Sequence, residues 1–337
     1  MKQTAVVILN YNGAGMLRRF LPSVIEYSPE ASIYVADNGS SDESCDVVRN
    51  EFPAVKLMVL DHNYGFAEGY NRALAQVDEE YAVLLNSDVE VTRGWLSPMT
   101  QFLDSNPEVA ACQPKLLSFK QKDFFEYAGA AGGFIDKWGY TFCRGRIFNT
   151  VEKDSGQYDD TTDVFWATGA SLMIRNEVYK NNGGLDGRFF AHMEEIDLCW
   201  RLRSRGYRIA CVPQSHVYHV GGATLKKENP QKTYLNFRNN LLMIYKNAPD
   251  CQLKKIMLFR KVFDNVAALK FLASGDYAAF KAVRKARRDF KAMRSGYDKA
   301  RAENMKLAVT TRIPEVLKSS ILYKYYLGFK HTYSSLK

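Results

Sequence analysis

Apolar runs of strand length alternate with helical patterns over the first 110 residues. Between the first two runs, Met16, Phe20 and Val24 recur at the spacing of one helix face. Because strands that alternate with helices form parallel sheets through right-handed crossovers, this order predicts a doubly wound α/β fold. The four strand-like runs are 5–9, 33–36, 55–60 and 81–85.

The pattern is weaker over residues 113–163, where we expect loops and short antiparallel strands. A helix is expected directly after Met193, because Leu198 and Leu202 share one face and Gly206 ends the run. The other predicted elements are a single strand over 164–174, a helix over 176–182, a strand over 207–212, and helices over 234–245, 258–271, 278–293 and 321–333.

The chain has 337 residues, whereas single domains usually stop growing at roughly 250 to 300 residues. We therefore expect two units, a catalytic α/β domain over 1–245 and a basic helical extension over 246–337. Residues 251–337 hold 20 Lys and Arg against 6 Asp and Glu, a charge of +14 that leaves −5 of the total +9 for residues 1–250. This asymmetry indicates an anionic partner for the extension alone.

No segment looks like a targeting signal or a membrane span. The first apolar run, 5–9, is too short for the core of a signal peptide, and no window approaches the ~18 to 20 apolar residues of a spanning helix. The six cysteines include no CxxC pair, which is typical of a reducing compartment. We expect a cytoplasmic protein whose membrane contact, if it has one, is peripheral.

Polar, turn-forming residues follow each of the first four strands. In doubly wound sheets, ligands bind at the carboxyl ends of the strands, so four such segments at one edge predict a binding site. A dinucleotide site is disfavoured, because Arg18 stands where the third glycine of that fingerprint would allow close helix packing. The four segments are 10–12, 37–42, 62–71 and 86–90.

Two further features carry candidate chemistry. Asp88 after the fourth strand and His219 after a later strand could share a divalent ion such as Mg²⁺ or Mn²⁺. Glu194, Glu195 and Asp197 crowd the start of the helix after Met193, where a base could remove a proton from an alcohol. The alternative interpretation of these carboxylates is that they only complement the helix dipole.

Together these segments resemble the inverting family 2 glycosyltransferases of the GT-A fold, a mostly parallel, Rossmann-like sheet that binds nucleotide diphosphate sugars. The similarity is greatest to bacterial rhamnosyltransferase-like enzymes that build surface polysaccharide, and it covers roughly residues 3–245. It rests on the runs 7–12, 37–42, 63–71 and 85–88 together with 189–201.

The resemblance implies a role for each residue. Asp37 would accept a hydrogen bond from the pyrimidine ring, and Asp88 would be the last carboxylate of the family's DxD signature, whose first position holds Asn86 here. Glu195 aligns with the family's catalytic base, although the choice between Glu195 and Glu194 stays open. The other implied site residues are Asn10, Tyr11, Asn12, Asn38, Gly65, Phe66, Asn71 and Ser87 for the nucleotide sugar, and Trp166 and Gly169 on the acceptor side.

The predicted activity is transfer of a sugar, with inversion, from a UDP- or dTDP-sugar to a hydroxyl of a glycan or polyprenyl-linked acceptor in polysaccharide biosynthesis. Two alternatives are a nucleotidyltransferase that makes nucleotide sugars and a non-catalytic, carbohydrate-binding scaffold. We expect the extension to hold the enzyme at the inner face of the membrane through anionic lipid, or else to cap the catalytic domain. No nucleic-acid partner is expected, because the extension has no recognisable reading motif.

Overall fold

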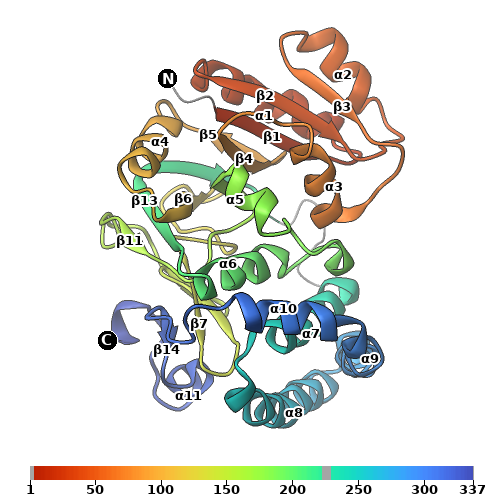
Figure 1. Ribbon diagram of the computed structural model, residues 1–337, viewed down its shortest axis with the longest axis vertical. Coiled ribbons are helices and arrows are strands. Elements are labelled where there is room, and N and C mark those ends of the chain that lie inside the picture. The colour runs from red at the N-terminus through yellow and green to blue at the C-terminus, as the bar shows by residue number, and fades with distance from the viewer. Residues whose placement is uncertain (1–3, 222–228, 337) are drawn as a thin grey trace.

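A computed structural model of the protein describes residues 4–221 and 229–336 (Figure 1). Its first half is a nine-stranded, mostly parallel sheet with the strand order β11-β13-β6-β12-β4-β1-β2-β3 and with β5 beside β13. The predicted doubly wound α/β fold is confirmed. The strands are β1 (Thr4–Asn10), β2 (Ala31–Asp37), β3 (Lys56–Val59), β4 (Tyr81–Asn86), β5 (Val89–Val91), β6 (Val109–Ser118), β11 (Thr162–Asp163), β12 (Ser171–Arg175) and β13 (Arg208–His219).

Burial of both faces explains why the central strands are continuously apolar. In β1, Val6 and Ile8 pack into the hydrophobic cluster on one face, whereas Ala5 and Val7 pack into the cluster on the other. The helices of this half are α1 (Ala14–Tyr27), α2 (Ser44–Glu51), α3 (Gly65–Leu74), α4 (Leu96–Ser105), α5 (Asn176–Asn181) and α6 (Glu194–Ser204).

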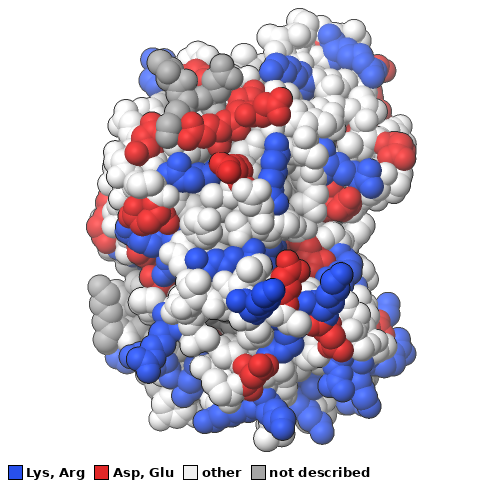
Figure 2. Space-filling model, in the orientation of Figure 1, with Lys and Arg blue, Asp and Glu red and all other residues white. Residues whose placement is uncertain are grey.

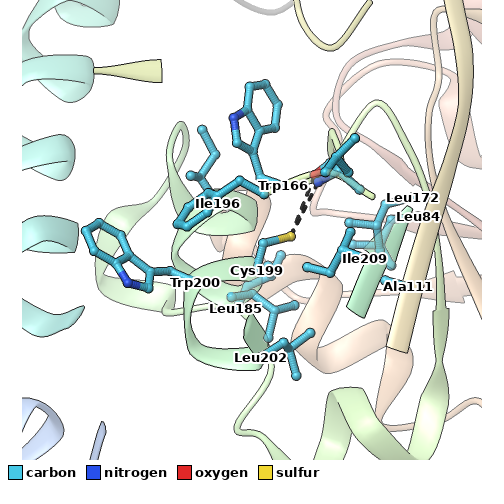
Figure 3. Close-up of a cluster of buried hydrophobic side chains, with 14 of the residues drawn as sticks. Leu84, Ala111, Trp166, Leu172, Leu185, Ile196, Cys199, Trp200, Leu202 and Ile209 are labelled. Carbon is cyan, nitrogen blue, oxygen red and sulfur yellow. Dashed lines mark hydrogen bonds between the residues drawn. The ribbon is translucent and has the colours of Figure 1, made fainter. Parts of the chain in front are cut away.

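Helix α6 lies on the sheet through a fully buried apolar face (Figure 3). Leu198 and Leu202 have no exposed surface, as the predicted helix face requires. Cys199 lies between them, and its Sγ accepts a hydrogen bond from the backbone N–H of Ala167 at 3.5 Å. Packing of this face fixes the carboxylates at the start of α6 relative to the carboxyl ends of the strands.

The single strand predicted over 164–174 is wrong. Strand β11 ends at Asp163, before this range, and β12 begins only at Ser171, so residues 164–170 belong to neither strand. Trp166 lies in this interruption: its indole covers Gly133, where a Cβ atom would lie 2.0 Å from the ring, and donates to the carbonyl of Phe134 at 3.0 Å. The irregular segment brings Gly169 to the carboxyl edge of the sheet.

The basic extension forms one end of the molecule (Figure 1). Its main helices are α7 (Pro230–Asn247), α8 (Asp250–Ala273), α9 (Tyr277–Met293) and α10 (Asp298–Leu307). The helix predicted over 321–333 is shorter, α11 (Ile321–Tyr326). The boundary expected at residue 245 falls inside α7, and the division into two units stays a prediction.

The end of the chain returns to the first half of the molecule. Strand β14 (Val316–Leu317) pairs with β7 (Gly133–Asp136) in a second sheet, ordered β10-β9-β8-β7-β14. The backbone N–H of Ile321 also donates to Asp136 at 2.9 Å. The remaining strands are β8 (Thr141–Cys143), β9 (Arg146–Ile147) and β10 (Thr150–Val151).

Candidate active site

The loops after β1 and β2 are joined by buried hydrogen bonds. Asp37 is 1 % exposed, and its carboxylate accepts from the Asn10 amide at 3.0 Å and from the backbone N–H of Ser40 at 2.9 Å. The Oδ1 atom of Asn10 is buried without a partner among the described residues. A Cβ atom on Gly13 would lie 2.3 Å from that oxygen, so the glycine leaves room for it.

The next two predicted residues continue this edge. Asn12 has a left-handed backbone (φ 50°), and its side-chain oxygen accepts from the backbone N–H of Ser41 at 2.8 Å. Tyr11 is 49 % exposed, which leaves its ring free to meet a ligand. The structure thus brings Asn10, Asn12 and Asp37 together and presents Tyr11 at the surface beside them.

The start of α3 contacts the aromatic loop (Phe189–Met193) that precedes α6. Gly65 has a φ of +77°, and a Cβ atom there would lie 2.5 Å from the Phe190 ring. The backbone N–H of Phe66 donates to the Phe190 carbonyl at 2.7 Å. Asn38 holds the turn before Gly65, because its amide donates to the Gly65 carbonyl at 3.0 Å.

Asn71 points to a different partner. Its amide donates to the Leu185 carbonyl at 2.8 Å, and its oxygen accepts from the Tyr179 hydroxyl at 2.6 Å. These bonds tie α3 to the chain ahead of α6. Its predicted contact with the nucleotide stays a prediction.

Asp88 and His219 are brought together, as their predicted sharing of an ion requires. The Oδ1 atom of Asp88 lies 3.1 Å from Nε2 of His219, and both side chains are 5 % exposed. Glu126 lies on the other side of the imidazole, 3.4 Å from Nδ1. Sequence reasoning missed Glu126, because it follows β6 in a region with no periodic pattern.

Charge dominates this cluster. Burial alone would lower the pKa of His219, but the neighbouring Glu126 and Asp88 carboxylates raise it to about 10. Burial likewise opposes ionisation of Asp88, yet the hydrogen bond from His219 lowers the pKa of that carboxyl. Without a bound ion, the cluster therefore favours a protonated imidazole between two carboxylates, and a metal ion at Nε2 would displace that proton.

The donor atoms suit a divalent ion shared with a substrate. One carboxylate and one imidazole are ligands that Mn²⁺ accepts, and Asn86 lies 3.4 Å from the same imidazole nitrogen. Among the described residues, no group of three or more His, Cys, Asp or Glu side chains forms a metal site by itself. Phosphate oxygens would therefore have to complete the coordination, and Ser87 lies between the two polar side chains in the chain.

The aromatic loop has an unusual backbone that Asn239 of α7 stabilises. Phe190, His192 and Met193 all have positive φ angles, of 66°, 71° and 74°, which non-glycine residues rarely adopt. Asn239 is fully buried. Its side-chain amide donates to three backbone carbonyls of this loop, at 2.8 to 3.0 Å, those of Phe189, Ala191 and His192. Arg238, Asn240, Lys246 and Asn247 of α7 are buried as well, so no sequence signal singled out Asn239 for this role.

Glu194 and Glu195 differ in their ionisation. Burial, together with the negative charge of Glu195, raises the pKa of Glu194 well above its ordinary value. Burial also raises the pKa of Glu195, to about 7. The backbone N–H groups of Glu195, Ile196 and Gly169 partly offset the effect of desolvation on this pKa. Burial of two adjacent carboxylates therefore opposes ionisation of both together.

Contacts place Glu195 beside the short segment that contains Gly169 and Ala170. A Cβ atom on Gly169 would lie 3.8 Å from that of Glu195 and 3.0 Å from the Phe66 ring. The next residue, Ala170, accepts from the backbone N–H of Asn86 at 3.0 Å. Glu195 and the Asp88 cluster therefore flank one short segment of chain.

Two other predicted residues are held inside the protein. Trp166 is 3 % exposed, so its side chain supports the loop from within, and its place on the acceptor side stays a prediction. Asp197 is fully buried and pairs with Arg201 at 3.1 Å and Lys246 at 2.8 Å. Asp197 thereby joins α6 to α7, beyond any effect on the helix dipole.

Comparison with known proteins identifies the class. The family model described as "Glycosyl transferase family 2" matches residues 5–182. The chain belongs to this family, and it is a glycosyltransferase, as predicted, and neither of the two alternatives.

The relatives include rhamnosyltransferases. The chain is 26% identical over 233 residues to the N-acetylglucosaminyl-diphospho-decaprenol L-rhamnosyltransferase of Mycobacterium tuberculosis, covering 64% of this chain and 75% of that protein. It is 28% identical over 163 residues to the rhamnosyltransferase WbbL of Escherichia coli K12, covering 46% of this chain and 61% of WbbL. These matches confirm the rhamnosyltransferase-like branch of the family.

Solved structures show the same fold. S. aureus TarS (residues 1–349, with UDP) superimposes with a TM-score of 0.54 at 16% identity, over 97% of this chain and 92% of that chain. GalNAc-T7, solved with UDP, GalNAc and Mn²⁺, superimposes with a TM-score of 0.61 at 15% identity, over 98% and 57%. The fold is therefore GT-A, with added C-terminal helices.

We expect Asn239→Ala to lower the free energy of unfolding by about 1 to 3 kcal/mol, because loop carbonyls would lose their buried donor. Asn181→Ala, at an exposed position on α5, is the matched control and should change it by less than about 0.5 kcal/mol. Urea denaturation measures both. Equal stability of the two variants would show that Asn239 does not hold the loop.

Proposed function

We propose that this glycosyltransferase moves a sugar, with inversion, from a nucleotide diphosphate sugar, UDP- or dTDP-linked, to a hydroxyl of a glycan or polyprenyl-linked acceptor. The observation that carries the proposal is the pair of buried carboxylates at the start of α6, of which Glu195 has a pKa of about 7. A base with a pKa near the working pH is the most effective acceptor of a hydroxyl proton.

Glu195 would take the proton of the acceptor hydroxyl as its oxygen attacks the anomeric carbon. The bond from that carbon to the diphosphate breaks at the opposite face, so a single displacement inverts the configuration. Glu194, held neutral by burial, places no second full charge beside the base. Asp37 and Asn10 would position the nucleoside at the neighbouring strand ends.

Asp88 and His219 would hold a divalent ion, Mn²⁺ or Mg²⁺, against the donor diphosphate. Such an ion neutralises the negative charge that develops on a departing diphosphate. Two structural neighbours were solved with Mn²⁺: GalNAc-T7 together with UDP and GalNAc, and the mannosyltransferase PcManGT of Pyrobaculum calidifontis (TM-score 0.52) together with GDP-Man. These neighbours support the proposed ion.

The proposal of a lipid-linked acceptor is also supported by a similar protein. The M. tuberculosis relative has a lipid-linked diphosphate sugar as its named acceptor. Within residues 4–221 and 229–336, no helix is long and apolar enough to cross a membrane. Contact with a lipid-linked acceptor would therefore be made by the surface of the protein, at the inner face of the cell membrane.

Helix α8 has a surface suited to that contact. Leu258, Val262, Val266 and Leu269 form an apolar stripe and are 52 to 65 % exposed. Lys and Arg side chains gather over this end of the molecule (Figure 2). Exposed apolar side chains among cations favour an interface with anionic lipid.

Glu195→Gln should lower kcat by roughly 10² to 10⁴-fold, because the amide cannot accept the proton. Glu194→Gln is the matched control, since it replaces a neutral acid with a neutral amide, and it should keep most of the activity. In the wild type, kcat should fall about tenfold per pH unit below pH 7, where Glu195 becomes protonated, and level off above it.

Steady-state transfer assays over a pH series measure these effects. An inactive Glu194→Gln beside an active Glu195→Gln would assign the base to Glu194. Donor binding, measured separately for each variant, shows whether a loss of turnover comes from the chemical step.

Asp88→Asn should abolish the extra thermal stabilisation that Mn²⁺ gives to the complex with a nucleoside diphosphate. The reason is that only a ligand preferring the folded form raises the melting temperature, and the variant has lost the charged ligand of the ion. Differential scanning fluorimetry of both proteins, with and without Mn²⁺, checks this. Full wild-type activity in excess EDTA would contradict the proposed ion.

The triple change Leu258→Ser, Val262→Ser and Leu269→Ser should reduce flotation with anionic liposomes at low salt, because it removes the apolar part of the interface but leaves every charge. Neutral liposomes serve as the control and should carry little of either protein. Equal flotation of the variant and the wild type would show that the α8 stripe does not touch lipid.

A further inference from the structure

A surface groove of about 730 Å³ lies between α7 and α9, outside the candidate active site. Four cationic side chains line it, Lys281, Arg284, Lys285 and Arg288, and no carboxylate is among the described residues that do. The remaining lining residues are neutral. A hollow of this size with four positive charges is suited to a compact anion with several oxygens.

The start of α7 adds to the positive potential. Pro230 and Gln231, the first two residues of this 18-residue helix, also line the groove. Pro230 has no N–H and the Gln231 N–H already donates to the Asn229 side chain at 2.8 Å, so the start of α7 contributes only its helix dipole, which favours an anion. The groove therefore combines fixed backbone dipoles with mobile cations.

Some of the four cationic side chains interact with other residues of the protein. Arg288 pairs with Asp289 at 3.1 Å, and Arg284 donates to the Asn265 amide oxygen at 3.3 Å. Lys285 lies 4.5 Å from the centre of the Tyr234 ring. These neighbours orient the side chains, while the four together keep an excess of positive charge.

The groove adjoins the aromatic loop, which leads directly into the start of α6. Tyr234 and Ala282 line the groove and also pack in a cluster with Ala191 of the aromatic loop. Burial and the charge of Lys232, in the first turn of α7, lower the pKa of His192 in the same loop. Ala191 is four residues from Glu195, at most about 14 Å along the chain. This reach is comparable with one sugar residue that carries a diphosphate.

We propose that the groove between α7 and α9 binds the diphosphate group of a lipid-linked acceptor while the acceptor sugar lies at Glu195. The proposal rests on the proposed function and names the acceptor subsite that the function needs. Lys281 and Lys285 contact the diphosphate, and the dipole of α7 favours the same anion.

A binding experiment on the full-length protein tests the groove directly. The donor site is first saturated with Mn²⁺ and the nucleoside diphosphate that stabilises the protein best, so that a second diphosphate cannot enter it. Geranyl diphosphate and geraniol are then titrated by calorimetry. The wild type should bind the diphosphate at least roughly tenfold more tightly than the alcohol, since charged hydrogen bonds are lost in the alcohol.

The double variant Lys281→Gln/Lys285→Gln should bind geranyl diphosphate roughly tenfold more weakly and keep its affinity for the nucleoside diphosphate. The matched control is Lys254→Gln/Lys261→Gln on α8, which removes the same charge outside the groove and should bind geranyl diphosphate as the wild type does.

Three outcomes would overturn the proposal. These are equal affinity of the groove variant and the wild type, equal weakening in the two double variants, and wild-type affinity for geraniol that matches its diphosphate. A groove variant that binds geranyl diphosphate normally but floats less with anionic liposomes would assign the groove to lipid headgroups instead. Wild-type stabilisation by a nucleoside diphosphate with Mn²⁺ is measured in parallel, and its absence would count against the proposed function and not against the groove.

Discussion

Desolvation of two adjacent carboxylates at the start of α6 is the constraint on which the site depends. Two buried like charges cannot both ionise, so one proton stays on the pair near neutral pH. The backbone N–H groups around Glu195 partly stabilise its charged form, whereas Glu194 has none of them beyond its own. This inequality favours Glu195 over Glu194 as the member of the pair that carries the negative charge. A more exposed position would lower both pKa values and remove the distinction.

The aromatic loop makes that burial possible, and its cost is met by elements distant in the sequence. Positive φ angles at three non-glycine residues cost on the order of 1 to 3 kcal/mol each. Asn239 of α7 binds the loop carbonyls from one side, and the backbone N–H of Phe66 in α3 binds Phe190 from the other. The N-terminal sheet and the C-terminal helices therefore both act on the same few residues. Asp197 strengthens this link through Lys246.

Local pattern was sufficient to predict the sheet and the polar edge, because alternation and turn chemistry are short-range signals. The pairing of Asn10 with Asp37 follows directly from the parallel register of β1 and β2. Glu126 and Asn239 were not predictable in this way, since their roles depend on contacts with residues far away in the chain. The break between β11 and β12 was missed for a related reason: Gly133 accommodates the Trp166 indole, and neither residue signals the other. Polar residues that lie in irregular or apolar stretches of the sequence are candidates for such long-range contacts.

Charge is distributed between the two ends of the molecule according to what each would bind. The edge of the sheet holds Asp37, Asp88 and Glu195, so a donor diphosphate entering it meets negative charge, and a divalent ion between the two removes the repulsion. The groove between α7 and α9 has cations and no carboxylate among its described lining, so an anion there needs no metal. Under the proposed function, the two diphosphates of one reaction are thus distinguished by electrostatics. The donor is selected by an ion held at Asp88, and the acceptor by fixed cations on the far side of the aromatic loop. Since the loop leads directly into α6, both recognition sites would bear on the position of Glu195.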